Sequence, residues 1–353
     1  MTLLWRIQTS PDVTWEQADL FQRLAVITSE GRTSGCFVTI KRLIPRVGNV
    51  TEHAEGNFLG LPEGDGTADV VILSVPYELT TSYGQGTCDG PKATLQASSQ
   101  VELYDPLLPE DLPCGFHLHT AQPWDGEGGS LEEQLSGITD YVSQHDSAFP
   151  VILGGEHGML PAIMRSISKR IDLNDLTLVQ IDAHADLRDE LEGDADSHAC
   201  AARRSLDLGV GKILQIGIRA FAREEAEFIA EDVRVESWLA REVLNPCGGE
   251  ATWLNWLNTL SEIEGPVWLT LDIDSLDPSY VPTTGTPVPG GLAFWQVIET
   301  IETISSAPSA KWMGADINEI VPDPNQHVTE FTAAMLATKI VAAHLARRLE
   351  DES

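Results

Sequence analysis

The chain is poor in positive charge. Of its 353 residues 22 are Lys or Arg, against 54 Asp or Glu, so the formal net charge is −32. A phosphate backbone is bound through a basic surface, and we therefore exclude nucleic acid as a partner. The acid excess favours a cationic substrate, although a charged surface that keeps a protein soluble explains most of it equally well.

Cysteines and long apolar runs are also scarce. The five cysteines are odd in number and scattered, and none forms a Cys-x-x-Cys pair. This excludes a disulfide framework and a zinc ribbon, and it favours a reducing cytoplasm. Arg6 interrupts the apolar start, and no other run approaches the ~18 apolar residues of a membrane span. We expect a soluble cytoplasmic protein without a membrane anchor.

The first 50 residues differ in charge from the rest. They carry six basic and four acidic residues, a charge of +2, which leaves −34 on the other 303 residues. A stretch rich in Gly, Glu and Pro follows and reaches Gly66. We predict an N-terminal extension over residues 1–56, which need not be well ordered, and a single functional domain over residues 57–353.

From Asp69 onward, short β-branched runs alternate with longer amphipathic or Ala-rich stretches. The alternation predicts an α/β fold, a parallel sheet with helices on both faces. We expect strands at Val70–Val75, Pro150–Leu153, Thr177–Asp182, Ile213–Ile218, Pro266–Asp274 and Lys311–Ile317. We expect helices at Leu131–Gln144, Leu160–Ile171, Arg223–Glu231, Ala251–Ile263, Phe294–Ser305 and Glu330–Leu349. Ligands of such sheets bind beyond the carboxyl ends of the strands.

One strand end carries three polar side chains. Asp182, His184 and Asp186 follow an apolar run, and alternate residues of a strand face the same way, so they should converge. Buried charges are rare unless they are paired or bound to a metal. We interpret the three residues as metal ligands, with a solvated, salt-bridged strand end as the alternative.

Two other strand ends supply the same kinds of group. Asp272 and Asp274 follow an apolar run, and His157 lies on a glycine-rich turn, where alone it indicates only a surface histidine. Four carboxylates and two imidazoles are too many for one closed zinc site and too hard for copper or an iron–sulfur cluster. Two divalent ions that share bridging carboxylates would use all six, and manganese suits such ligands.

These motifs, in this order, resemble those of the arginase/agmatinase (ureohydrolase) family, whose members hydrolyse guanidinium compounds to urea and an amine at a binuclear manganese site. The resemblance spans Asn57 to Arg348, and the elements over 154–158, 182–186 and 272–278 carry it. The stretch Thr80–Gly84 is most like the agmatinase-type branch. The resemblance implies an arginase-like three-layer αβα fold and a homo-oligomer, a trimer or a hexamer.

The resemblance also implies a role for each site residue. Asp182 and Asp272 would bridge two Mn²⁺ per chain. The first ion would be held by His157, Asp182, Asp186 and Asp272, and the second by His184, Asp182, Asp272 and Asp274. His198 would relay a proton to the departing amine, and Glu319 would pair with the substrate guanidinium. Without the resemblance, each of these two residues indicates only an ordinary loop or capping position.

The chain departs from the family pattern at two positions. Glu156 stands where the pattern has Asp, and Gly158 stands where it has Ser, so a hydroxyl beside the metal ligands is lost. The loop Leu187–Asp196 carries five carboxylates where arginases hold the amino-acid head of their substrate. Such a loop should repel a carboxylate, which favours a small cationic guanidino substrate, agmatine above all, hydrolysed to urea and putrescine as in polyamine biosynthesis.

Several alternatives stay open. Aminopropylagmatine, guanidinobutyrate, formiminoglutamate, guanidine or arginine could be the substrate, because specificity lies in loops that a sequence does not position. A catalytically silent family member that binds a polyamine or a partner protein is a different class, which the intact ligand set disfavours. A zinc deacetylase of similar architecture would need one metal and leave the convergence of Asp186 and Asp274 unexplained.

Overall fold

The computed structural model describes residues 56–64, 66–126 and 129–352. The predicted N-terminal extension, residues 1–56, lies outside these residues save for Gly56. The described residues form an eight-stranded sheet in which all paired strands are parallel, in the order β2-β1-β3-β8-β7-β4-β5-β6. The strands are β1 Val70–Val75, β2 Leu118–Thr120, β3 Phe149–Gly154, β4 Thr177–Ile181, β5 Lys212–Ile218, β6 Val235–Leu239, β7 Gly265–Asp272 and β8 Ala310–Asn318.

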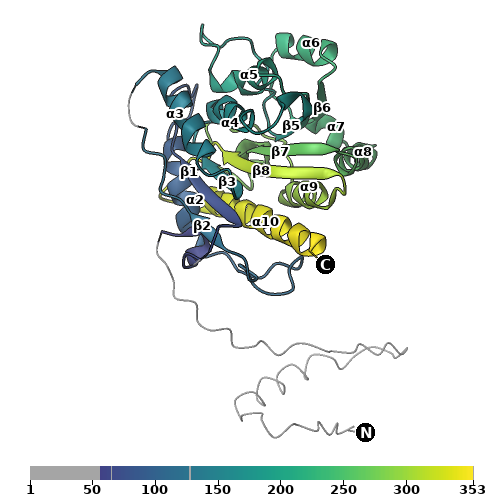
Figure 1. Ribbon diagram of the computed structural model, residues 1–353. Helices are drawn as coiled ribbons and strands as arrows, with labels where there is room; N and C mark the ends of the chain where they lie inside the picture. The colour runs from purple at the N-terminus through teal and green to yellow at the C-terminus, as the bar shows by residue number, and fades with distance from the viewer. Residues whose placement is uncertain (1–55, 65, 127–128, 353) are drawn as a thin grey trace, which may run out of the picture. The chain divides into compact units, whose positions relative to one another are not determined.

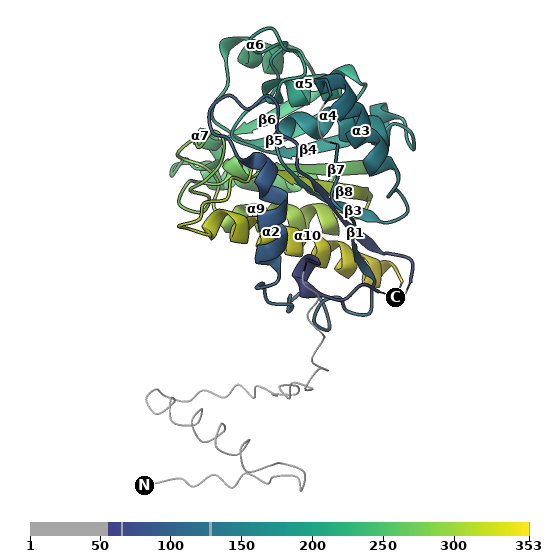
Figure 2. The same cartoon turned by 90° about the vertical axis from the view of Figure 1, so that its left-hand side faces the viewer.

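Helices cover both faces of the sheet, as Figures 1 and 2 show from two sides. One layer holds α3 Leu131–Ser143, α4 Leu160–Ile167, α5 Ala201–Asp207 and α6 Arg223–Glu231. The other holds α2 Gly90–Ser98, α8 Gly249–Ser261, α9 Phe294–Ser306 and α10 Val328–Asp351, and the short α7 Ala240–Val243 packs against α8. The predicted three-layer αβα fold is confirmed.

Burial on both faces explains the continuous apolar runs of the central strands. In β7, Val267, Leu269 and Leu271 pack into the core beneath α8, α9 and α10, and Trp268 packs into the core on the opposite face. Thr270 follows Trp268 on that opposite face, because side chains two residues apart share a side of the sheet. A polar group is thereby placed inside an apolar strand.

The six predicted strands are all present, with small errors at their ends. Two predicted strands are too long, because β4 ends before Asp182 and β7 ends at Asp272. The short outer strands β2 and β6 and the helices α2, α5 and α7 escaped prediction, since each carries a weak apolar pattern. Among the described helices, none combines the length and the apolar character that a membrane crossing requires.

Candidate metal centre and active site

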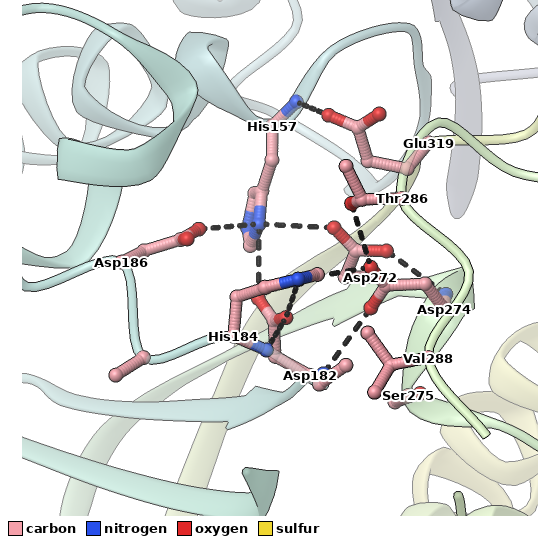
Figure 3. Close-up of polar contacts among 12 residues, drawn as sticks. His157, Asp182, His184, Asp186, Asp272, Asp274, Ser275, Thr286, Val288 and Glu319 are labelled. Carbon is pink, nitrogen blue, oxygen red and sulfur yellow. Dashed lines mark hydrogen bonds and ion pairs between the residues drawn. The ribbon is translucent and has the colours of Figure 1, made fainter. Parts of the chain in front are cut away.

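The site lies where four neighbouring strands, β3, β8, β7 and β4, come to their carboxyl ends. Each contributes a ligand-type side chain just beyond its last residues, in the manner of open α/β sheets. Figure 3 shows that side chains from these separate turns point toward one another. They are His157 after β3, Asp182, His184 and Asp186 after β4, Asp272 and Asp274 at the end of β7, and Glu319 after β8.

His157 stands at the centre of the first group. Its Nδ1 lies 3.2 Å from Oδ2 of Asp182, 3.2 Å from Oδ2 of Asp186 and 3.5 Å from Oδ2 of Asp272. The His157 side chain is 1% exposed, and this nitrogen has no hydrogen-bond partner of acceptable geometry. His157, Asp182 and Asp186 therefore form one group that could hold a metal ion.

A second group overlaps the first. His184 Nδ1 lies 3.0 Å from Oδ2 of Asp274 and 3.8 Å from Oδ1 of Asp182. His184, Asp182 and Asp274 also lie close enough to share an ion. Asp182 thus belongs to both groups: its Oδ2 faces His157 and its Oδ1 faces His184. A pair of neighbouring ions requires a carboxylate that is shared in this way.

Turns rather than strand alternation bring these ligands together. Asp182 Oδ1 accepts a hydrogen bond from the amide of His184 at 2.7 Å, and Asp272 Oδ1 accepts one from the amide of Asp274 at 2.9 Å. Asp186 adopts a left-handed backbone with φ of 53°. The predicted side chains do converge, but the reason given for it from the sequence was wrong, since only Asp272 belongs to a strand.

Two glycines place His157. A Cβ on Gly154 would lie 2.0 Å from Asn318 Oδ1, and a Cβ on Gly155 would lie 2.1 Å from the carbonyl oxygen of Tyr77. Side chains at these positions would push the turn away from its neighbours. The end of β3 and the turn after it can therefore stay against β8 and against Tyr77, which follows β1, only with glycines, and this keeps His157 over the strand ends.

The donor set fits a divalent ion, because a buried relay aims the lone pair of His157 at the carboxylates. The hydroxyl of Thr270 donates its only proton to Oδ2 of Asp316, at 2.6 Å. Its oxygen must therefore accept the hydrogen bond that joins it to Nε2 of His157, at 2.8 Å. The imidazole proton then sits on Nε2, and Nδ1 is free to bind a cation. Sequence analysis missed Thr270 and Asp316, and the available signal was a polar residue inside each of two apolar strands.

Burial and crowding shift the pKa values of several groups of the cluster. Burial raises the pKa of Asp182 to about 6, and the charge of Asp186 adds to this. Burial lowers the pKa of His184, but the attraction of Asp274 outweighs it and raises the pKa to about 10. Burial lowers the pKa of His157, but the three carboxylates close to its ring outweigh burial and hold the pKa well above the ordinary value. The cluster retains protons that a divalent cation would displace.

His198 and Glu319 line one narrow cavity together with His157, His184 and Asp186. Glu319 has a left-handed backbone, φ 65°, and its Oε1 accepts from the amide of His157 at 2.8 Å. Burial raises the pKa of Glu319 to about 8, against the effect of that hydrogen bond. The structure thus brings both residues to the ligand cluster.

A second cavity of about 480 Å³ adjoins the first and shares His184, Asp186 and His198 with it. Its wall includes Glu225, whose side chain is 4% exposed, and Arg188, which lies 3.2 Å from Glu224. The cavity is wide enough for a chain attached to a group bound at the ligand cluster. Arg188, the one arginine or lysine of this wall, is already paired with Glu224 and Glu225.

The acidic loop Leu187–Asp196 does not act as the sequence suggested. None of its five carboxylates, all of which belong to described residues, lines either cavity. Asp189 instead pairs with Arg204 at 2.9 Å and its side chain is 78% exposed. Asp189 is thus held by an ion pair with the neighbouring helix, and because none of the five carboxylates lines a cavity, repulsion of a substrate carboxylate by these side chains has no geometric support.

The fold and the site define an arginase-like αβα protein whose clustered His and Asp side chains could hold metal. A family model described as Arginase family matches residues 68–345. An N(1)-aminopropylagmatine ureohydrolase of Synechocystis sp. is 35% identical over 285 residues, which cover 78% of this chain and 88% of that protein. An agmatinase of Pyrococcus horikoshii is 33% identical over 279 residues, covering 78% and 91%.

Solved structures agree. The agmatine ureohydrolase of Thermoplasma volcanium matches with a TM-score of 0.68 at 30% identity, covering 80% of this chain and 92% of that one. An arginase of Bacillus subtilis, at 21% identity and a TM-score of 0.61, shares the fold. The chain belongs to the arginase family. It is a hydrolase of the ureohydrolase type, which acts on guanidino C–N bonds.

Proposed function

We propose that the protein hydrolyses a guanidino-amine, agmatine in the first place, to urea and putrescine with two Mn²⁺ per chain. The observation that carries the proposal is the position of Asp182 in two overlapping ligand groups. Hard oxygen and imidazole donors suit manganese. The first ion would be held by His157, Asp182, Asp186 and Asp272, and the second by His184, Asp182, Asp272 and Asp274.

The ions would supply a water of lowered pKa that is nucleophilic near neutral pH. Glu319 would bind the guanidinium, whose planar N–H groups suit a carboxylate. A guanidinium cation beside Glu319 would favour the ionised carboxylate and offset the effect of burial. His198, which lines the same cavity as Glu319, would hold a proton at a ring nitrogen and give it to the departing amine.

The second cavity supports a cationic tail on the substrate. Asp186 and Glu225 are acidic groups of its wall, and Arg188 is paired with glutamates. The acidic groups of this wall would repel a substrate carboxylate placed here. Arginine and guanidinobutyrate should therefore bind less well than agmatine. The size of the cavity, about 480 Å³, also favours aminopropylagmatine as a second candidate, because its tail is longer.

A substrate panel tests this proposal. Urea release with Mn²⁺ added is measured for agmatine, aminopropylagmatine, guanidinobutyrate and arginine. We expect kcat/KM for the two amines to exceed that for arginine by about ten-fold or more, in line with one opposed charge near the site. Preference for arginine would overturn the guanidino-amine assignment. Absence of urea from all four substrates would favour a silent, polyamine-binding protein.

The functional unit and its setting are part of the proposal. We assign catalysis to residues 57–353 in a homo-oligomer, a trimer or hexamer, acting in the cytoplasm. The family model begins at residue 68, and the four described cysteines are free thiols, as in a reducing compartment. Deletion of residues 1–50 should leave kcat and cooperative unfolding nearly unchanged, and an inactive or insoluble product would contradict the boundary.

A further inference from the structure

We propose that Glu156 acts through Thr80 as a positioning residue for His198, and that Gly158 provides the space for Glu156 to do so. The inference rests on the proposed function, because His198 is the proton relay of that reaction. It concerns two positions, 156 and 158, at which the chain departs from the family pattern.

Glu156 is a completely buried carboxylate, 0% exposed, that accepts hydrogen bonds from a neighbouring loop. Its Oε2 accepts hydrogen bonds from the amides of Leu79 at 2.7 Å and Thr80 at 2.6 Å. Its Oε1 accepts the hydroxyl proton of Thr80. Three donors from one short segment therefore satisfy this buried charge and fix the loop that carries Thr80.

The single hydroxyl proton of Thr80 decides which nitrogen of His198 carries a proton. Since that proton goes to Glu156, the oxygen of Thr80 can only accept further hydrogen bonds. It accepts from the amide of His198 at 2.9 Å and lies 3.3 Å from the ring nitrogen Nδ1. In the neutral ring Nδ1 must then be the protonated nitrogen, and Nε2 keeps its lone pair.

Nε2 of His198 is the nitrogen on the open side of the ring. It lies 3.3 Å from the hydroxyl of Ser82, and both residues line the cavity that holds Glu319. A ring oriented in this way takes up and releases its proton at Nε2, on the side of the substrate. Thr80 fixes both the tautomer and the direction of the ring, as does the partner of a catalytic histidine generally.

Gly158 leaves the space that Glu156 occupies. A Cβ at this position would lie 2.7 Å from Oε1 of Glu156 and 3.4 Å from the amide nitrogen of His198. The carboxylate could give way only by losing its hydrogen bonds to the Thr80 segment. A side chain at position 158 would thus crowd the carboxylate of Glu156, and glycine leaves room for it.

The test compares Thr80→Val with Thr80→Ser in the full-length, Mn²⁺-loaded enzyme, with agmatine as the substrate. Valine removes the hydroxyl at nearly constant shape, and serine keeps it. We expect Thr80→Val to lower kcat by about 10-fold or more while KM and metal content stay within about two-fold, and Thr80→Ser to retain most of kcat. Equal kcat for the valine variant and the wild type would overturn the inference.

The same substitution in a His198→Ala background separates positioning from a general structural role. If Thr80 acts through His198, Thr80→Val should lower kcat by less than about two-fold once the histidine is gone. An equal loss in both backgrounds would show that Thr80 serves the loop alone and would overturn the inference. A wild type that releases no urea from any guanidino compound would instead overturn the proposed function itself.

Glu156→Gln provides a second route if the valine variant does not fold. Its amide group can donate to Thr80, so the hydroxyl turns its proton toward His198 Nδ1 and reverses the tautomer. We expect a loss of kcat that depends on His198 in the same way, with unchanged KM. A loss that persists in the His198→Ala background would contradict the assignment.

Discussion

The site has two regions that differ in how firmly they are held. The floor consists of side chains at strand ends that are 6% exposed or less: His157, Asp182, Asp186, Asp272 and Asp274, with Thr270 and Asp316 behind them. The rim consists of the loops Thr80–Gly84 and Leu187–His198, in which Tyr83 is 82% exposed. Residues that carry out the shared chemistry of a family are expected on the rigid floor. Residues that determine which substrate is bound are expected on the rim.

The largest effect is expected on the floor, at the carboxylate that both ligand groups share. Asp182→Ala should remove both ions and lower kcat by more than about 10³-fold, because neither group is complete without it. Elemental analysis and urea release measure the two effects. Asp189→Ala is the matched control on the rim, and it should leave both ions in place. Retention of one full ion by the Asp182 variant would argue against a bridge.

The relay behind His157 should have a smaller but specific effect. Thr270→Val removes the group that fixes the protonated nitrogen of His157, and we expect metal affinity to fall by about 10- to 100-fold. Thr270→Ser keeps the hydroxyl and should bind metal nearly as the wild type does. Calorimetric titration with Mn²⁺ measures the affinity. Equal Mn²⁺ affinities of the Thr270→Val variant and the wild type would contradict the relay.

The site as a whole should also make the metal-free protein sensitive to pH. Asp182, Glu319 and His184 have pKa values raised from 3.8, 4.5 and 6.5 to about 6, 8 and 10. The folded state therefore binds more protons than the unfolded state across this range, and stability falls as pH rises. Calorimetry after chelation should show Tm decreasing by several degrees, roughly, from pH 5 to pH 8.

Bound metal should weaken or reverse this trend, because the ion takes the place of the protons and binds more tightly as pH rises. The metal-loaded protein is thus the control for the pH series. A Tm of the metal-free protein that stays constant or increases between pH 5 and pH 8 would show that the cluster is not crowded with unneutralised charge.

The smallest effect is expected on the rim. Asp189 pairs with Arg204 and, like Glu190, lines neither cavity, so Asp189→Asn combined with Glu190→Gln should change the agmatine-to-arginine ratio of kcat/KM by less than about two-fold. Measurement at low and high salt sharpens the comparison, since exposed charges are screened. A ten-fold fall in the ratio would restore the role that the sequence suggested for this loop.

The sequence predicted the floor far better than the rim. Strands buried on both faces appear as apolar runs, and the polar residues at their ends are visible without coordinates. The side chains of Asp182 and Asp186 converge because of turns, and the hydrophobic periodicity of the sequence does not predict the geometry of turns. The position of Asp189 could not be predicted, because the arginines that pair with it, Arg203 and Arg204, lie on α5, and only the folded chain shows which way Asp189 points.

The relays escaped prediction for a related reason. Thr270 and Asp316 are distant in sequence and meet because β7 and β8 are neighbours in register. Glu156 and Gly158 stood out only as departures from a pattern, and the sequence does not show that a Cβ at 158 would meet the carboxylate of Glu156. Contacts across a sheet or between a turn and a loop carry no local signal in a single sequence.

The measurement that tests the central claim most directly is the number of ions per chain at full activity. The metal-free protein is titrated with Mn²⁺ while urea release from agmatine and bound metal are followed in the same samples. Two overlapping groups that share Asp182 predict that activity reaches its maximum as bound Mn²⁺ approaches two per chain. Full activity with one ion per chain, or undiminished activity without any, would contradict the binuclear site.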